Sequence, residues 1–215
     1  MRLHRLASLA LLLISPAPAF AGSRLPLTVR VYDMTSDRSD RTRALAAAAA
    51  ALAPAEVEVQ WLDPRSAPAG PVPPQDLVLR LARRTPSTAR PGPVALGYAL
   101  VDSTGRRGTV ATIFLEQVEW LARVSGADVE ELTGLAIAHE IGHLLTGTNA
   151  HARHGLMRAR WTAGELRARR ASDWELGPEE RHQLRAGLAA RLSTRPAAPD
   201  GVIAGVRRPT GGLLN

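Results

Sequence analysis

The 215-residue chain has 45% hydrophobic residues, enough to bury the core of one domain of ordinary size. It contains no cysteine, which excludes disulfide bonds and cysteine-ligated metals, so that a metal could be held only by His, Asp or Glu. All 27 basic residues are arginines scattered along the chain, and the net charge of +7 with 4% aromatic residues argues against nucleic-acid binding, so binding of nucleic acid or lipopolysaccharide is a minor alternative.

The first residues have the pattern of a secretion signal. Two arginines precede an apolar stretch at residues 6–14, and the small residues at 19–21 fit a cleavage site. The apolar stretch is too short to cross a bilayer as a helix, and no later segment is long and apolar enough. We therefore expect a signal peptide at 1–21 and an exported protein, periplasmic or extracellular, without a transmembrane anchor after cleavage.

A strand, a helix and a second strand are predicted after the signal. Residues 27–32 alternate apolar and polar side chains as a strand does. The alanine-rich segment that follows has high helix propensity, with Ser39 or Asp40 as its expected cap and Pro54 as its end. Residues 57–62 form the second strand, which the right-handed βαβ rule places parallel to the first.

Three more strands are predicted in the middle of the chain. Residues 64–74 are rich in Pro and Gly and are expected to form a loop. Strands follow at 76–82, 96–102 and 109–114. A turn-like STGRRG segment joins the last two, so we expect them to form an antiparallel pair within an otherwise parallel sheet.

The remaining elements are predicted to be helices. The spacing becomes helical over residues 115–124, and another helix starts at Asp128, with Glu131 in capping-box register. A further helix covers 178–192, with Pro at its first turn.

These elements predict one domain over residues 22–192. The Pro/Gly-rich segment 193–215 is expected to be a disordered tail. We expect the protein to be a monomer.

One of the predicted helices carries the segment HEIGH, which has the pattern of a zinc site. His139 and His143 are four residues apart, so they lie on the same face of a helix and can bind one ion. Glu140 lies beside the first histidine, where it can act as a general base on a zinc-bound water. The helix is apolar nearly all round, and two buried histidines and a glutamate need partners, which a metal would supply.

A catalytic zinc takes three protein ligands and keeps one open position. The third ligand could come from one of three candidates further along the chain, His151, His154 or Glu165. Glu165 would follow the pattern in which a glutamate on a later helix completes the site. The spacing within the helix does not choose between them.

The segment resembles the motif of metzincin metallopeptidases, HExxHxxGxxH followed by a methionine-containing turn, especially in matrixin-like and archaemetzincin-like members. By this resemblance Gly147 ends the helix and Met157 forms the Met-turn beneath the imidazoles. Two positions depart from the pattern, because Gly147 is shifted by one residue and Asn149 stands where the family has its third histidine.

The length of the loop is nevertheless that of a matrixin, since Met157 follows His139 by the family spacing. The resemblance therefore favours His151 as the third ligand over His154, which is too close to the Met-turn, and over Glu165, which lacks the expected flanking residues. One catalytic Zn²⁺ is implied.

The resemblance also implies a fold and a substrate groove. The fold would be α/β (α+β), a zincin-like twisted mixed sheet with one antiparallel edge strand, a backing helix and the HExxH active-site helix. Tyr98 could contact a reaction intermediate, although packing is the simpler role, and Trp161 could pack beneath the Met-turn or line the cleft. An extended peptide would bind along an edge strand formed by Gly97, Tyr98, Ala99, Leu100 and Val101.

The expected function is that of a secreted or periplasmic zinc metallopeptidase acting on peptide or protein substrates. The alternative is a non-catalytic, zinc-stabilised binding domain. Glu140 favours the enzyme, because a structural site needs no general base beside its ligand.

Overall fold

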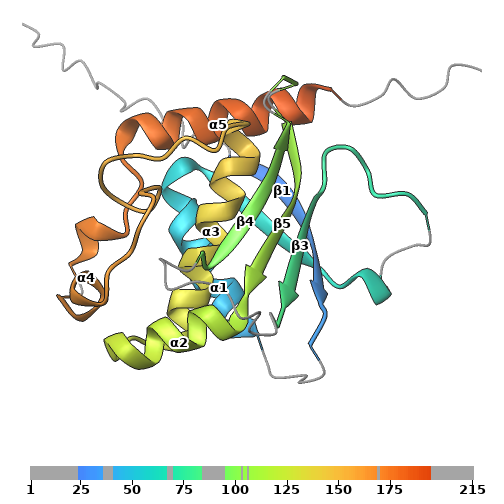
Figure 1. The fold of residues 1–215 in the computed structure, drawn as a ribbon. Helices are drawn as coiled ribbons and strands as arrows, with labels where there is room; N and C mark the ends of the chain where they lie inside the picture. Colours follow the sequence, from blue (N-terminus) through green and yellow to red (C-terminus); the bar gives the residue numbers. More distant parts are fainter. Residues whose placement is uncertain are drawn as a thin grey trace, which may run out of the picture.

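Five strands form one mixed sheet in the computed structural model (Figure 1), which describes residues 24–35, 41–66, 70–83, 95–102, 104–105, 107–168 and 170–194. The strand order is β2-β1-β3-β5-β4, with β4 at one edge. Neighbours from β2 to β5 are parallel, whereas β4 runs antiparallel to β5. The predicted mixed sheet with one antiparallel edge strand is confirmed. The strands are β1 (Leu25–Asp33), β2 (Val57–Leu62), β3 (Leu77–Ala82), β4 (Gly97–Asp102) and β5 (Arg107–Phe114).

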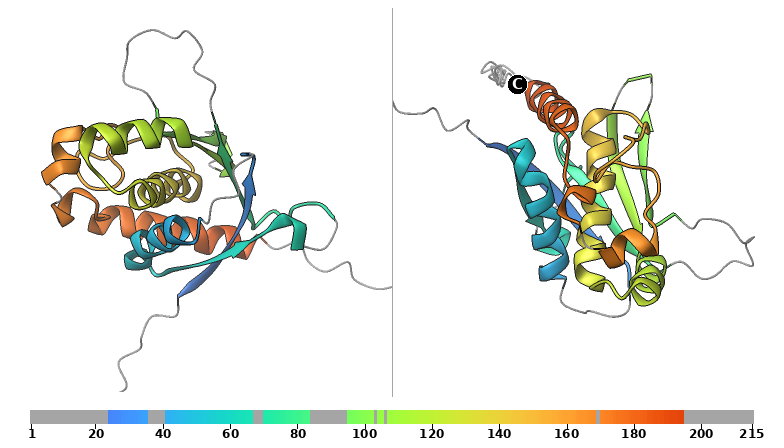
Figure 2. Two further views of the ribbon diagram at one scale, coloured as in Figure 1. Left: turned by 90° about the horizontal axis from the view of Figure 1, so that it is seen from below. Right: turned by 90° about the vertical axis from the view of Figure 1, so that its left-hand side faces the viewer.

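The helices gather on one face of this sheet (Figure 2). The predicted helices are all present within one or two residues of their expected ends, whereas α4 and three short 3₁₀ turns were not predicted. One of these turns, at Pro64–Ser66, interrupts the segment expected to be loop throughout. The helices are α1 (Thr42–Leu52), α2 (Leu115–Ser125), α3 (Val129–Thr146), α4 (Ala163–Ala168) and α5 (Pro178–Ser193).

The alternation of side chains along the strands explains why the helices lie on one face. In β3, Leu77, Leu79 and Leu81 are completely buried, and the residues between them are not. In β1, Leu27 and Val29 are buried in the same way. One face of the sheet is therefore apolar and packs against the helices, as period-2 patterning requires.

Helix α3 runs through the interior, between α1 and the strands β4 and β5 (Figure 2). The close approach of α1 and α3 depends on Gly134, where a Cβ atom would lie 2.6 Å from the Ala44 carbonyl oxygen. The small side chains of the alanine-rich α1 make this approach possible.

The two ends of α3 are fixed as the sequence predicts. Asp128 is the N-cap, and its side chain accepts hydrogen bonds from the backbone N–H groups of Glu130 (3.0 Å) and Glu131 (2.9 Å). Gly147 ends the helix in the left-handed conformation, with φ of 65°, and donates its N–H to the His143 carbonyl oxygen. Glycine adopts this conformation without the steric cost of a Cβ atom.

The residues expected to cap α1, Ser39 and Asp40, lie outside the described residues. The N-cap is Arg41, and its side chain makes no capping hydrogen bond. The first residue of the helix is Thr42. The high alanine content allows it to form without a side-chain cap, because alanine has the highest intrinsic helix propensity.

The expected signal peptide at 1–21 lies outside the described residues. The disordered tail expected at 193–215 begins too early, because Ser193 is the last residue of α5 and Thr194 is its C-cap, whereas residues 195–215 lie outside the described part of the chain. Within the described part of the chain, no helix has both the length and the apolar character needed to cross a membrane.

Candidate metal centre

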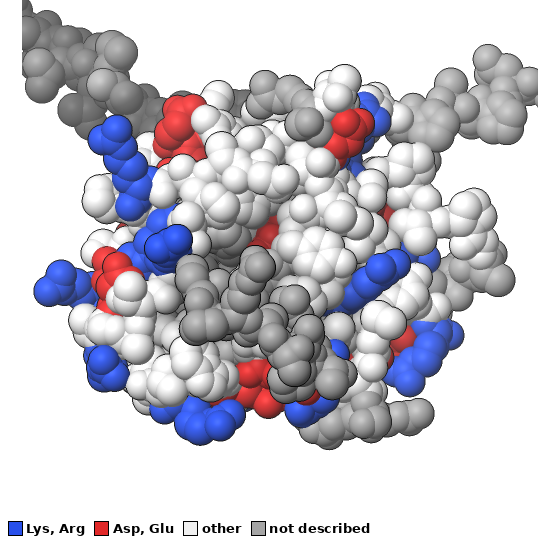
Figure 3. Space-filling view, in the orientation of Figure 1, with Lys and Arg blue, Asp and Glu red and all other residues white. Residues whose placement is uncertain are grey.

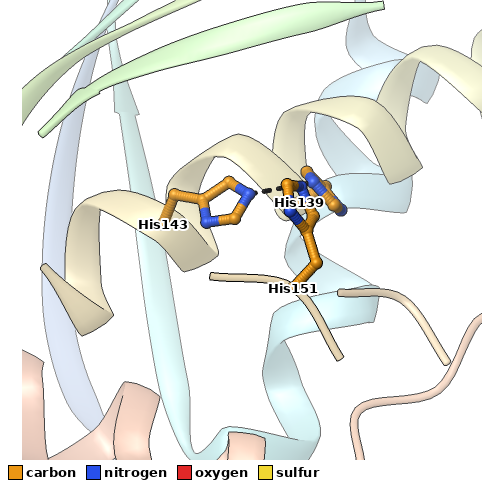
Figure 4. A group of neighbouring side chains, drawn as sticks. All are labelled: His139, His143 and His151. Atoms are coloured by element: carbon orange, nitrogen blue, oxygen red, sulfur yellow. Dashed lines mark hydrogen bonds between the residues drawn. The ribbon is translucent and has the colours of Figure 1, made fainter. Parts of the chain in front are cut away.

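Three imidazoles converge where α3 meets the loop that follows it (Figure 4). His139 and His143 stand on successive turns of α3, and His151 comes from the loop. One nitrogen from each ring lies within 4.8 Å of the other two. Three neutral imidazoles at such spacing are the donor set of a typical zinc site.

The hydrogen bonds of the two helical histidines determine which nitrogens face the centre. Nδ1 of His139 lies 2.8 Å from the Leu156 carbonyl oxygen, and Nδ1 of His143 lies 2.8 Å from the Thr148 carbonyl oxygen. A carbonyl oxygen only accepts, so each Nδ1 must carry the proton. Such backbone partners are those that orient metal-ligating histidines.

The two Nε2 atoms therefore carry lone pairs in the neutral rings, and they face each other at 3.0 Å (dashed line in Figure 4). Two acceptors at this distance repel each other, so the contact is not a stable hydrogen bond in the neutral state. A cation placed between these lone pairs and His151 removes the repulsion. The residues present therefore fit a zinc ion.

The rings are kept neutral by their surroundings. Burial lowers the pKa of His139 to about 4, and it also lowers the pKa values of His143 and His151. His151, although exposed, stacks on His139 with ring centroids 5.3 Å apart. Neutral imidazoles are the form that binds metals.

Glu140 lies next to the imidazoles and opposite the edge strand. Only 8% of it is exposed, and burial raises the pKa of its carboxyl to about 7. A Cβ atom at Gly97 would lie 3.1 Å from Cγ of Glu140 and 2.7 Å from the Thr112 carbonyl oxygen, so glycine allows the strand to pass close to the carboxylate. Among the described residues, Glu140 has no salt-bridge partner.

Met157 packs against α3 at Gly142. Gly142 lies directly before His143 on α3, and a Cβ atom added to it would be 2.6 Å from Sδ of Met157. Only 5% of Met157 is exposed. The loop is held by a hydrogen bond from the Ala152 N–H to the Met157 carbonyl oxygen, 2.9 Å long. Gly155, with φ of 74°, makes the turn that precedes the methionine. The role of Met157 in a Met-turn stays a prediction.

A cleft of about 630 Å³ opens over the histidines and Glu140. One wall is formed by the edge strand β4, a second by α2 with Trp120, Leu121 and Val124, and a third by the segment after Met157. In Figure 3 acidic atoms are visible near the centre of a largely uncharged face, and basic side chains are spread around its edge. The arginines on this face are scattered, as the sequence suggested.

The edge strand borders the cleft with its first half. Gly97, Tyr98 and Ala99 line it, whereas Leu100 and Val101 do not. Tyr98 is 40% exposed and its ring packs on Phe114 with centroids 5.7 Å apart. Tyr98 thus both packs on Phe114 and lines the cleft.

The other two candidates for the third ligand lie apart from the cluster. His154 is exposed and does not line the cleft. The carboxylate of Glu165 accepts hydrogen bonds from the Thr162 hydroxyl, at 2.7 Å, and from Nη1 of Arg158, at 3.0 Å. His151 is the residue brought to His139 and His143, and its role as a ligand stays a prediction. Asn149, which stands at the family's third-histidine position, lines the cleft.

The segment after Met157 contributes further residues to the cleft, among them Arg158, Arg160 and Trp161. The Trp161 ring stands edge-on to His139 with centroids 5.7 Å apart and lines the cleft, one of the two positions expected for it. Arg158 also lines the cleft and was missed, because its neighbours Glu165 and Trp174 come together only in the fold.

No family model and no curated protein matches the sequence. Among solved structures, archaemetzincin from Methanopyrus kandleri is similar to the chain, with a TM-score of 0.46 and 15% sequence identity, covering 79% of this chain and 98% of that one.

Proposed function

We propose that the protein is a zinc-dependent endopeptidase in which His139, His143 and His151 hold one ion and Glu140 is the general base. The observation that carries the proposal is the meeting of three neutral imidazoles and a buried carboxylate in one cleft beside an edge strand. When bound, zinc supplies a Lewis acid that activates water near neutral pH and polarises a carbonyl.

The residues around the site have distinct tasks. A carboxylate oxygen of Glu140 takes a proton from the attacking water and delivers it to the leaving amine. The free edge of β4 offers backbone groups to an extended peptide, which would bind as an additional strand. Gly97 lets β4 itself lie close to Glu140, because a Cβ atom there would lie 3.1 Å from Cγ of Glu140.

Zinc content and peptide hydrolysis of four variants test the ligand assignment. We expect His139→Ala and His151→Ala to lose zinc and activity, whereas His154→Ala and Glu165→Ala keep bound zinc. Full zinc content and activity in His151→Ala would show that another residue is the third ligand.

Glu140→Gln tests the catalytic role, because it keeps the size of the side chain and removes the base. We expect it to bind zinc normally and to lose at least about a hundredfold in hydrolysis rate. If the wild type binds zinc and hydrolyses no peptide, the alternative of a non-catalytic zinc-stabilised domain is correct.

We also propose that the protein is exported, supported by the charge and apolar pattern of residues 1–21. N-terminal sequencing of protein recovered from the periplasm or the medium should give a chain that starts near Gly22. Recovery of the uncleaved chain in the cytoplasm alone would contradict export.

A further inference from the structure

The segment after Met157 forms a wall of the cleft, and it carries hydrogen-bond donors that have no acceptor among the described residues. We call Arg158, Arg160 and Trp161 the cationic wall; all three line the cleft. The other charged residue in the lining is Glu140. The wall therefore places two positive charges beside a site whose own acid is needed for catalysis.

The guanidinium of Arg158 is only partly used by the protein. Its Nη1 donates to Glu165 at 3.0 Å and lies 4.0 Å from a carboxylate oxygen of Asp173, and its Cζ is 4.9 Å from the centre of the Trp174 ring. The side chain is 10% exposed. Its Nε and Nη2 atoms are buried and have no acceptor among the described residues.

These two atoms form one edge of the guanidinium, with N–H bonds that point in the same direction. This edge matches the two oxygens of a carboxylate, which it binds by a pair of parallel hydrogen bonds. Leaving such donors buried without an acceptor is unfavourable, so an acceptor that reaches them is bound with a gain in free energy.

The neighbouring residues of the wall offer further donors. Nε1 of Trp161 is buried and lacks an acceptor among the described residues. Arg160 is exposed and makes no salt bridge with any described residue. A carboxylate in the cleft can therefore reach the exposed Arg160 directly, whereas side chains of the lining must shift before it reaches the buried donors of Arg158 and Trp161.

We propose that the cationic wall is a carboxylate-binding subsite, so that the preferred substrates are peptides with a carboxylate beside the bond that is cleaved. This inference rests on the proposed peptidase function and names its substrate class. The carboxylate can belong to an Asp or Glu side chain or to the C-terminus of a short peptide, and both present the same two oxygens to the wall.

Binding to zinc-loaded Glu140→Gln protein tests the subsite without hydrolysis. Calorimetry would compare three peptides that differ only in one side chain and in the C-terminus. The first has an acidic side chain and an amidated C-terminus, the second has a neutral side chain and a free C-terminus, and the third has a neutral side chain and an amidated C-terminus. We expect one or both carboxylate peptides to bind about tenfold to a hundredfold more tightly than the neutral amidated peptide.

Variants of the wall separate this subsite from direct binding of the carboxylate to zinc. Arg160→Gln and Arg158→Gln should each reduce the preference, and Arg160→Glu should reverse it in favour of a basic peptide. Arg160 is exposed, so its variants stay informative even if Arg158→Gln does not fold. Arg153→Gln is the matched control, because Arg153 is an exposed arginine of the same loop outside the cleft lining.

Two results would overturn the subsite: equal affinity for all three peptides, or a preference that both Arg160 variants leave unchanged. The hydrolysis assay on the wild type distinguishes this failure from failure of the proposed function. Cleavage of acidic and neutral peptides at equal rates contradicts the subsite alone, whereas absence of any cleavage contradicts the peptidase.

Discussion

Asp128 is a single side chain that determines where the helix of the metal centre begins. Its carboxylate accepts from two backbone N–H groups and from Arg43 at 2.9 Å, and these hydrogen bonds, that of Glu131 above all, lower its pKa. A lowered pKa in the folded state means that the cap stabilises the protein above the unfolded pKa. This stabilisation is lost as the pH falls through the folded pKa.

We therefore expect Asp128→Ala to reduce the free energy of unfolding by about 1 kcal/mol at pH 7. Asp128→Asn keeps the capping acceptor, so it should stay within a few tenths of a kcal/mol of the wild type. Urea unfolding at pH 7 and at pH 3 measures both effects. The difference between wild type and Asp128→Ala should shrink at pH 3, and an unchanged difference would contradict the role of the charge.

Because Gly142 contacts Met157, we expect the effect of Gly142→Ala on the free energy of unfolding to change sign when Met157 is replaced by alanine. An added Cβ atom at Gly142 would overlap Met157 Sδ, which outweighs the gain of up to about 1 kcal/mol from replacing glycine in a helix. We expect Gly142→Ala to destabilise the wild type and to stabilise the Met157→Ala variant, in which the overlap is gone. A double-mutant cycle by urea unfolding measures this coupling, and purely additive effects would mean that the two residues do not press on each other.

The residues that the sequence could reveal are those whose relation is local. His139, Glu140 and His143 lie within two turns of one helix, so their spacing alone predicts that they share a site. Arg158 could not be found in this way, because its place in the site depends on contacts with Glu165 and Trp174 and on a cleft wall. These contacts and the wall form only on folding. Trp161 is intermediate, since its proximity to Met157 predicted a place near the site without fixing which one.

At the scale of elements, the packing of α1 against α3 depends on the absence of a side chain at Gly134. A Cβ atom there would be 2.5 Å from the Cβ of Ala47 and 2.6 Å from a backbone oxygen that cannot move without shifting α1. We expect Gly134→Ala to destabilise the protein by about 1 to 3 kcal/mol, because overpacking exceeds the gain in helix propensity.

Gly164→Ala is the control for this substitution. Gly164 also lies in a helix, but the nearest atom to an added Cβ is 3.9 Å away, so the gain in propensity should prevail. Thermal unfolding of both variants gives the comparison. If Gly134→Ala is as stable as Gly164→Ala, the two helices are not in the close contact described.

The elements themselves were largely predictable, whereas their arrangement was not. Strands and long helices have hydrophobic periods of two and about 3.6 residues, and a turn-like segment indicated the antiparallel pair. The position of β3 between β1 and β5 is set by pairing between distant strands, for which the sequence has no local signal. Helix α4 is six residues long, too short for a hydrophobic period of 3.6 residues to be recognised.

For the whole molecule, the metal centre is expected to contribute to stability as well as to catalysis. The facing Nε2 atoms of His139 and His143, 3.0 Å apart, stand on a helix whose middle is buried, so their repulsion in the metal-free protein acts on the core. A ligand that binds only the folded state stabilises it by about 2.7 kcal/mol when its free concentration is a hundred times Kd.

We therefore expect a chelator to lower Tm by roughly 5 to 10 °C relative to the zinc-loaded protein, since about 1 kcal/mol corresponds to 2 to 4 °C in a chain of this size. Zinc added back should restore Tm, whereas Mg²⁺ should not, because it prefers oxygen ligands. The shift should vanish in His139→Ala and persist in His154→Ala, whose histidine lies outside the cluster. The same change in Tm in both variants would place the metal elsewhere. Metal binding at the three imidazoles would then not contribute to the stability of the fold.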